Sequence, residues 1–193
     1  MLLKVNLDFY KEKQEKLKNV EKDIIEIIKK NNKEEYEKII ENDKRLEVLK
    51  ALSIIRENII NWYPFELNAN ILEVNANFGE ITEELCIKAN NVISIEKSKY
   101  KAEAIKKRLA EIENLEIIVG KINNIELNQK FDYICINGLE EQEESLKEYV
   151  IFAKRFLKDD GIILFTCNNR FGVETWNCNS PENTEKKINM SKK

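Results

Sequence analysis

Residues 71–79 read Ile71-Leu72-Glu73-Val74-Asn75-Ala76-Asn77-Phe78-Gly79. The pattern is typical of a buried strand that leads into a ligand-binding turn and a helix, except that asparagine stands at two positions where glycine is usual. A second apolar run, Val92-Ile93-Ser94-Ile95, ends at Glu96. This acid follows the turn by about 20 residues, which is the spacing at which a carboxylate binds a nucleoside ribose. Together the two segments predict a pocket for a nucleoside cofactor.

Length and composition favour one compact domain with an appendage, because 193 residues suffice for one core but not for two full domains. The apolar runs are too short to cross a membrane, and the N-terminus lacks the features of a signal peptide. The four cysteines are widely spaced and form no Cys-x-x-Cys pair. We therefore expect a cytoplasmic protein with reduced thiols and no membrane partner.

The charge balance and the absence of histidine exclude several function classes. The chain has 32 basic and 35 acidic residues and a net charge of −3, so it lacks the basic surface that binds nucleic acid. It contains no histidine, which removes the commonest general base and the commonest metal ligand. We expect no metal site and no nucleic-acid partner.

Residues 1–61 are predicted to form an N-terminal helical extension, because they contain neither glycine nor proline and show apolar residues at helical spacing. One helix is expected from Leu17 to Ile28 and a second from Tyr36 to Ile59. Their apolar faces would pack against the rest of the chain or against a partner. A homo-oligomer formed through these helices is one hypothesis, and a glycosyltransferase partner is another.

From residue 62 onward, short β-rich runs alternate with helical patterns, which is typical of a doubly wound, Rossmann-like parallel sheet in an α/β fold. We expect about five strands, near residues 70–74, 92–95, 116–119, 132–136 and 161–166. Helices are expected over residues 79–89, 99–112 and 143–157, the first beginning at about Gly79. Residues 178–193 are polar and lysine-rich, and we expect a flexible tail there.

The spacing of the turn distinguishes between two cofactor classes. A dinucleotide fingerprint that starts at residue 75 requires a small residue at position 80, where this chain has Glu80. The retained glycine is Gly79, and an acid, Glu73, lies two residues before the turn. This arrangement favours S-adenosylmethionine over NAD, although an NAD-binding oxidoreductase remains a third alternative.

With these motifs, residues 62–177 resemble a class I S-adenosylmethionine-dependent methyltransferase domain. The first motif of that family, E/D-x-G-x-G-x-G, is matched by Glu73, Asn75, Asn77 and Gly79. Further segments resemble the methyltransferase domains that accompany bacterial surface-glycan glycosyltransferases. They are Trp62-Tyr63-Pro64-Phe65, Val92 to Lys97, Leu115 to Gly120, Phe131-Asp132-Tyr133 and Asn169-Arg170-Phe171-Gly172.

The resemblance implies a role for each site residue. Glu73 would orient the amino end of S-adenosylmethionine, the turn from Asn75 through Asn77 to Gly79 would line its methionine part, and Glu96 would hold the ribose. Lys121 and Ile122 would flank the adenine. The implied reaction is methyl transfer to a sugar or a surface-glycan precursor, with Glu140 as the nearest carboxylate for deprotonating the acceptor.

A second hypothesis is a catalytically inactive methyltransferase-fold module, a pseudoenzyme that serves interaction or scaffolding. Asparagine tolerates the left-handed backbone of a glycine turn at about 1 kcal/mol per site, but its side chain takes up space that a ligand needs. Similar domains carry Asp or Asn at the position of Lys121, whose ammonium only donates hydrogen bonds and cannot accept from an adenine amino group. The chain also ends before the last two strands that complete most such domains.

Overall fold

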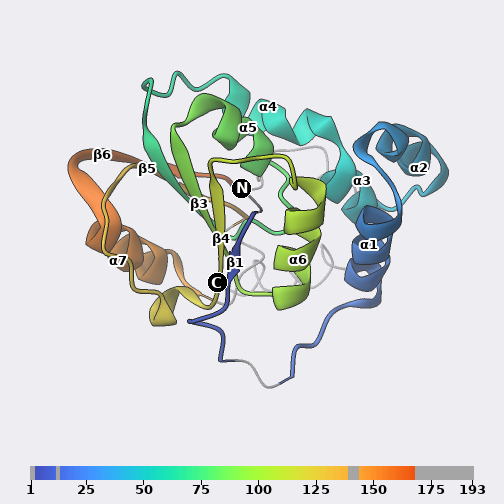
Figure 1. Cartoon of the computed structure of the whole chain (residues 1–193), viewed down its shortest axis with the longest axis horizontal. Helices are drawn as coiled ribbons and strands as arrows, with labels where there is room; N and C mark the ends of the chain where they lie inside the picture. Colours follow the sequence, from blue (N-terminus) through green and yellow to red (C-terminus); the bar gives the residue numbers. More distant parts are fainter. Residues whose placement is uncertain (1–2, 12–13, 139–143, 168–193) are drawn as a thin grey trace, which may run out of the picture.

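The computed structural model describes residues 3–11, 14–138 and 144–167, and its centre is a six-stranded parallel sheet. The strand order is β1-β4-β3-β2-β5-β6. Figure 1 labels all of these strands except β2. The strands are β1 Val5–Asn6, β2 Asn70–Val74, β3 Asn91–Glu96, β4 Leu115–Val119, β5 Phe131–Ile136 and β6 Leu157–Phe165. The predicted Rossmann-like α/β fold is confirmed, and strands β2 to β6 are the five that were expected.

β2 lies in the middle of the sheet and is the point where the strand order reverses. It pairs with β3 on one side and with β5 on the other, so that Glu73 lies between Ser94 and Cys135. From β2 the chain winds outward through β3 and β4, and then returns to the other side of β2 for β5 and β6. The carboxyl ends of β2 and β5 therefore flank the crevice where open α/β sheets bind ligands.

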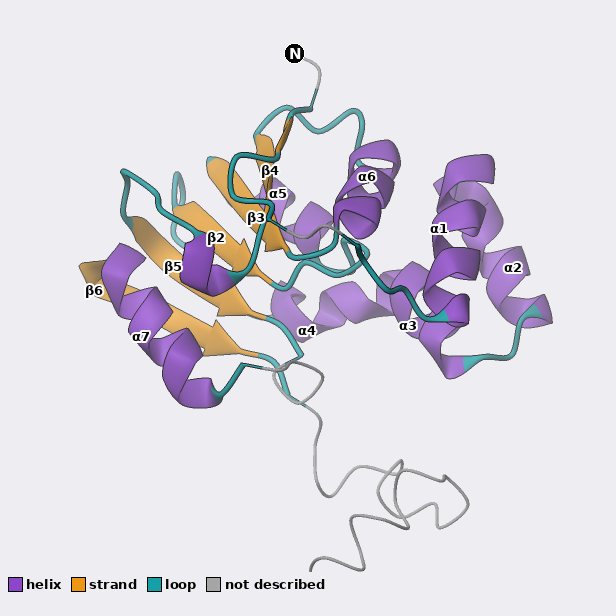
Figure 2. Ribbon diagram, turned by 90° about the horizontal axis from the view of Figure 1, so that it is seen from below, coloured by secondary structure: helices purple, strands orange, loops and turns teal. Residues whose placement is uncertain are grey.

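Helices cover both faces of the sheet because alternate strand residues point in opposite directions. Ile71 belongs to a core with α5 (Thr82–Lys88) and α6 (Lys99–Arg108). Its neighbour Leu72 belongs to a separate core with α7 (Leu146–Phe156) and the turn η3 (Ile122–Asn124). In Figure 2, α7 lies along one face of the sheet near β6, while α5 and α6 lie toward the other end of the molecule.

The N-terminal helices form a third core at the end of the molecule remote from β6 (Figures 1 and 2). Ile24, Ile28 and Val48 pack there with Phe78 and Ala104 of the sheet domain. The helical segments are α1 Asn19–Lys30, η1 Lys33–Glu35, α2 Tyr36–Asn42, α3 Leu46–Leu52, η2 Ile54–Glu57 and α4 Asn58–Asn61. The expected packing of these helices against the body of the chain is therefore observed.

The prediction of one continuous helix from Tyr36 to Ile59 is wrong, because two polar side chains interrupt the helical backbone. Asp43 accepts hydrogen bonds from the backbone N–H of Arg45 at 3.3 Å and from its Nε at 2.8 Å. Ser53 Oγ accepts from the backbone N–H of Ile55 at 3.2 Å. Such local bonds compete with helical backbone bonds. Helix α2 therefore ends before Asp43, and helix α3 ends before Ser53.

Strand β1 was also not expected, since the only elements predicted within residues 1–61 were helices. Val5 and Asn6 pair in parallel with Ile117 and Ile118 at the edge of the sheet. The chain then passes over Gly120, where an added Cβ atom would lie 3.0 Å from both Cβ and the carbonyl oxygen of Phe9. We call residues 3–11 the N-terminal strap. A two-residue strand is too short to leave a recognisable period in the sequence.

Within the described ranges, no helix combines the length and the apolar character that a membrane span requires. The same part of the chain shows no cluster of acidic or cysteine side chains that could hold a metal ion. The predicted tail at residues 178–193, and the question of strands beyond β6, lie outside the described residues.

Candidate functional site

The turn after β2 has the backbone of a glycine turn, although two of its residues are asparagine. The backbone angle φ is 61° at Asn75, 54° at Asn77 and 75° at Gly79. Asparagine enters this left-handed region more readily than other non-glycine residues, because its short amide bonds locally. The prediction that the turn keeps its shape is confirmed. The predicted helix start at about Gly79 is three residues early, since α5 begins at Thr82.

Glu73 is fully buried beneath this turn and is surrounded by hydrogen-bond donors. Its carboxylate accepts from the hydroxyl of Thr82 at 2.7 Å, from the hydroxyl of Ser94 at 2.5 Å and from Nδ2 of Asn137 at 3.1 Å. Burial raises the pKa of Glu73 to about 7, and the three donors only partly offset this effect. Glu73 therefore changes its protonation state near neutral pH.

The side chain of Asn75 connects the turn to the other half of the sheet. Its Nδ2 donates to the carbonyl oxygen of Asn137 and to the hydroxyl oxygen of Tyr149, both at 3.0 Å. The Tyr149 hydroxyl in turn lies 3.3 Å from a carboxylate oxygen of Glu144 and donates to it. Burial raises the pKa of Tyr149, so this phenol remains a donor at neutral pH. Asn75 thus occupies the crevice between β2 and β5.

Glu96 ends β3 beside the turn, and the residue is only 3 % exposed. One oxygen accepts from the backbone N–H of Asn77 at 2.7 Å and the other from that of Ser98 at 2.9 Å. Burial raises the pKa of Glu96, while Lys101 and these backbone bonds act in the opposite direction. Each oxygen keeps a second lone pair, so the carboxylate can still accept hydrogen bonds from a diol.

Two charged neighbours hold the side chain of Asn77. Its Nδ2 donates to Glu80 Oε1 at 2.7 Å, and its Oδ1 accepts from Nζ of Lys101 at 2.8 Å. Lys101 also forms an ion pair of 2.7 Å with Glu21 of α1. Lys101 therefore connects helix α1 to the side chain of Asn77 in the turn.

Lys121 and Ile122 follow β4 but have different surroundings. Ile122 is buried in the core beneath α7. Lys121 lines a cavity of about 210 Å³ at the carboxyl ends of β3 and β4. The other lining residues are Phe9, Tyr10 and Lys11 from the N-terminal strap, Lys97, Gly120 and Asn124.

The structure brings most of the predicted site residues together. Glu73, the turn from Asn75 to Gly79 and Glu96 are joined by the hydrogen bonds given above, on adjacent strands. Glu140, the predicted base, lies outside the described residues. Sequence reasoning missed Tyr149, which looked like a core residue of its helix, and Asn137. The place of Asn137 directly after β5, the strand beside the crevice, was the signal that could have found it.

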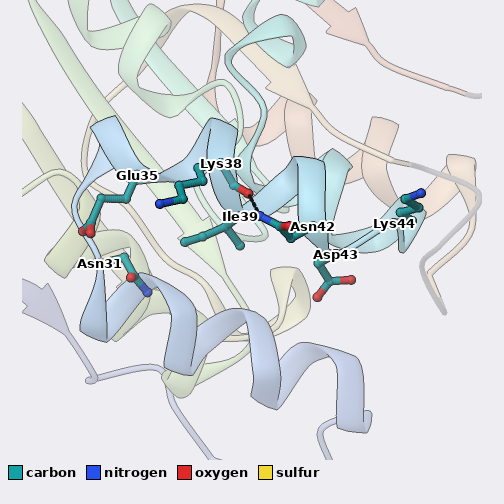
Figure 3. Close-up of a pocket in the computed structure, with 7 residues that line it drawn as sticks. All are labelled: Asn31, Glu35, Lys38, Ile39, Asn42, Asp43 and Lys44. Atoms are coloured by element: carbon teal, nitrogen blue, oxygen red, sulfur yellow. Dashed lines mark hydrogen bonds between the residues drawn. The ribbon is translucent and has the colours of Figure 1, made fainter.

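A larger depression lies elsewhere, between the end of α1 and helix α2 (Figure 3). Its volume is about 610 Å³. Two of the residues that line it are hydrogen-bonded to each other, since Nδ2 of Asn42 donates to the carbonyl oxygen of Lys38 at 2.6 Å. The side chains drawn there are Asn31, Glu35, Lys38, Ile39, Asn42, Asp43 and Lys44. None of the predicted site residues lines it, and we assign it no role.

Comparison with known proteins agrees with this geometry. Residues 72–165 match the family described as "Methyltransferase domain". No curated protein sequence matches the chain.

Among solved structures, one similar fold is phosphoethanolamine N-methyltransferase 1 of Haemonchus contortus, in complex with phosphoethanolamine and S-adenosylhomocysteine. It is 20 % identical, with a TM-score of 0.54 over 74 % of this chain and 32 % of that one. Another is an S-adenosylmethionine-dependent methyltransferase from Thiobacillus denitrificans in complex with S-adenosyl-L-homocysteine, 17 % identical, with a TM-score of 0.50 over 57 % of this chain and 47 % of that one. The chain thus spans less than half the length of either protein.

S-adenosylmethionine is the cofactor class that this family and fold indicate. Glu73 and Glu96 occupy the strand ends at which the sequence motif predicted them. Residues 72–165 thus match the methyltransferase-domain family, and the sheet has the topology of the class I, S-adenosylmethionine-dependent methyltransferase fold.

Proposed function

We propose that this protein binds S-adenosylmethionine at the carboxyl ends of β2 and β3 and transfers its methyl group to a small-molecule acceptor. The observation that carries the proposal is the left-handed backbone at residues 75, 77 and 79, directly beside the buried carboxylate of Glu96. A glycine-like turn on the central strand and an acid on the next strand are the two parts that a nucleoside cofactor requires.

Each residue would contribute to positioning. Glu96 would accept from the ribose hydroxyls with its second lone pairs, and the turn from Asn75 to Gly79 would line the methionine part. Glu73 would act through Asn137, whose Nδ2 it holds and whose Oδ1 is buried without a hydrogen-bond partner among the described residues. That oxygen is suited to accept from an ammonium group.

The bound sulfonium supplies an activated methyl group, so the protein has mainly to align donor and acceptor. Residues that hold the ligand therefore matter more than a strong base. We keep Glu140 as the proposed base for an acceptor with a high pKa, and Lys121 and Ile122 as the proposed neighbours of the adenine. An ammonium at residue 121 suits the acceptor nitrogens of the base and not its amino group.

The acceptor class that we propose is a sugar or a surface-glycan precursor. The support is the resemblance of the segments around Trp62, Val92 and Phe131 to methyltransferase domains that accompany glycan-building enzymes. The similar fold from Haemonchus contortus binds phosphoethanolamine, which is also a small molecule. A cytoplasmic location forms part of this proposal, since Cys86 and Cys135 are free, buried thiols.

Partner binding through the N-terminal helices is a separate proposal. Their main apolar faces are buried within the chain, but Ile54 and Ile55 remain 65 % and 68 % exposed, and Leu46 of α3 is 45 % exposed. These side chains could contact a second copy or a glycosyltransferase. Light scattering at micromolar concentration tests the first option, and a mass of one chain at every concentration would contradict it.

One set of contacts favours the second candidate function, a catalytically inactive module. Asn75 and Asn77 fill the turn with side chains that are bonded to Asn137, Tyr149, Glu80 and Lys101. Glu96 is nearly inaccessible in this arrangement. A ligand must displace these contacts before it reaches the carboxylate.

Isothermal titration calorimetry with S-adenosylmethionine, S-adenosylhomocysteine and NAD distinguishes the alternatives. The proposed enzyme binds the first two with micromolar affinity and does not bind NAD. Heat with NAD alone would support an oxidoreductase, and no heat with any ligand would favour the inactive module. Incubation with methyl-labelled S-adenosylmethionine and candidate sugar precursors then tests the acceptor class.

A further inference from the structure

Asn137 links the buried carboxylate of Glu73 to the crevice between β2 and β5. Its backbone N–H donates to the carbonyl oxygen of Val74 at 3.0 Å, and its own carbonyl oxygen accepts from Nδ2 of Asn75 at 3.0 Å. In the side chain, Nδ2 donates to Oε1 of Glu73 at 3.1 Å. The other end, Oδ1, is buried and has no hydrogen-bond partner within the described ranges. The amide of Asn137 is therefore held by its nitrogen alone.

The protonation state of Glu73 decides which end of this amide faces it. A carboxylate only accepts hydrogen bonds, so the charged side chain binds the Nδ2 end of Asn137 and leaves Oδ1 for another donor. A carboxylic acid donates through its proton, and an amide nitrogen cannot accept that proton. When Oε1 of Glu73 takes up a proton from solvent, the amide must turn over so that Oδ1 accepts from the acid.

The hydroxyls of Thr82 and Ser94 favour the proton on Oε1. Both hydroxyls donate to Oε2 of Glu73, at 2.7 Å and 2.5 Å, so a proton on Oε2 would require one of them to give up its bond. A proton on Oε1 leaves both bonds intact. It also supplies a donor to Oδ1 of Asn137, which has none in the charged arrangement. Because a buried oxygen without a donor is unfavourable, the turned amide is the better partner for the protonated acid.

The groups around Glu73 place this change near neutral pH. Burial and the negative charge of Glu80 raise the pKa of Glu73 to about 7, against the effect of its three hydrogen-bond donors. Cys86 on α5 and Cys135 on β5 also interact with Glu73, but burial raises the pKa of both thiols, so they remain neutral. Among these groups, Glu73 is the one that changes its charge between pH 6 and 8.

We propose that Glu73 and Asn137 together select ligands with a free ammonium group, and that a proton on Glu73 cancels this selection by turning the Asn137 amide. The inference rests on the proposed binding of S-adenosylmethionine and adds a control of its affinity by pH. With Glu73 charged, Oδ1 of Asn137 accepts from the ammonium of the methionine part. With Glu73 protonated, Nδ2 takes the place of Oδ1, and its N–H groups find no acceptor on an ammonium.

Calorimetry with two ligands tests this selection in the intact chain. S-adenosylhomocysteine carries the ammonium, whereas 5′-methylthioadenosine has the same adenosine and sulfur without the amino-acid part. We expect S-adenosylhomocysteine to bind about tenfold more weakly at pH 6 than at pH 8, because a group with a pKa of about 7 loses most of its charge over this range. The second ligand shares any effect of Glu96 and should change by less than about twofold. Equal changes for both ligands, or no change for S-adenosylhomocysteine, would overturn the proposal.

Two variants separate the amide from the carboxylate. Asn137→Ala should lower the preference for S-adenosylhomocysteine over 5′-methylthioadenosine about tenfold at pH 8 and remove its pH dependence. Glu73→Gln should also make binding independent of pH, because it removes the titrating group. The matched control is Asn128→Ala, since Asn128 is exposed in the loop before β5, and it should behave as the wild type. A pH dependence that persists in Asn137→Ala would show that Glu73 acts on the ligand directly and would refute the role of the amide.

A signal from the ligand-free protein separates this inference from the proposed function. The side-chain amide of Asn137 gives ¹H–¹⁵N NMR signals that can be assigned by their loss in Asn137→Ala. They should shift with a midpoint near pH 7 in the wild type and stay constant in Glu73→Gln. A protein that binds neither adenosine ligand would contradict the proposed function, while titrating signals would still support the turning amide. Binding of S-adenosylhomocysteine with signals that do not titrate would overturn the inference and leave the proposed function intact.

Discussion

Replacing both turn asparagines by glycine should strengthen cofactor binding. In Asn75→Gly/Asn77→Gly the backbone keeps its left-handed angles, because glycine adopts them freely. The variant loses the side chains that occupy the crevice and bond to Asn137, Tyr149, Glu80 and Lys101. A ligand entering the wild-type turn must give up these bonds, whereas a ligand entering the variant does not.

The hydrogen bonds set the size of the effect. Counting one hydrogen bond to each of the four neighbours named above, each bond contributes about 1 kcal/mol net. Displacing all four would cost about 4 kcal/mol, which is nearly a thousandfold in affinity at about 1.4 kcal/mol per factor of ten. If the ligand displaces only one bond at each asparagine, it binds the variant more favourably than the wild type by about 2 kcal/mol. That difference is more than tenfold in affinity. We therefore expect S-adenosylhomocysteine to bind between tenfold and a thousandfold more tightly.

Isothermal titration calorimetry measures this change, and Asn68→Gly is the matched control. Asn68 also has a positive φ, of 68°, but it is exposed and precedes β2, away from the crevice. The control should leave the affinity within about twofold of the wild type. Thermal unfolding checks that each variant is folded, because the double variant also loses the hydrogen bonds of both asparagine side chains in the free protein. An affinity of the double variant equal to that of the wild type would refute the steric argument.

Three further changes test other parts of the account. Glu96→Gln keeps the shape of the side chain but removes its charge, and it should weaken S-adenosylhomocysteine at least tenfold by calorimetry; an unchanged affinity would remove Glu96 from the ribose site. Glu73 has a pKa of about 7 in the folded protein, against an ordinary value of 4.5. Between these two pH values the folded protein therefore binds more protons than the unfolded chain. As the pH rises from 4.5 to 7, the free energy of unfolding falls by about 1.4 kcal/mol per pH unit. This loss of stability is complete above about pH 7. Urea unfolding from pH 4 to 8 should show the loss in the wild type but not in Glu73→Gln. If both proteins gave parallel profiles of unfolding free energy against pH, the pKa of Glu73 would not be raised. Gly120→Ala brings a Cβ atom to 3.0 Å from Phe9 and should destabilise the fold by about 1–3 kcal/mol in urea unfolding. An unchanged midpoint of urea unfolding would mean that the N-terminal strap does not pack against Gly120.

The parts of the fold that follow from strong local patterns could be predicted from the sequence. Strands β2 and β3 are mostly apolar because both of their faces are buried, and they end at Val74 and Glu96 within two residues of the prediction. The left-handed turn could be predicted as well, since asparagine is the residue that best replaces glycine at positive φ. In these places local preference and tertiary structure agree.

The parts that were missed depend on a single local side-chain bond or on contacts between distant segments. The break at Ser53 rests on one hydroxyl bonded to the backbone N–H of Ile55, which an amphipathic pattern does not reveal. The pairing of Val5 with Ile117 joins residues far apart in the sequence. Tyr149 occupies a core position in its helix, and only the folded chain brings its hydroxyl to Asn75.

The most direct test of the central claim is a crystal structure of the protein with S-adenosylhomocysteine. We expect the ribose hydroxyls on the carboxylate of Glu96, the homocysteine part along residues 75–79, and the side chains of Asn75 and Asn77 moved out of the crevice. Ligand bound away from Glu96, or an unchanged crevice without ligand at saturating concentration, would contradict the assignment of this strand edge as the cofactor site.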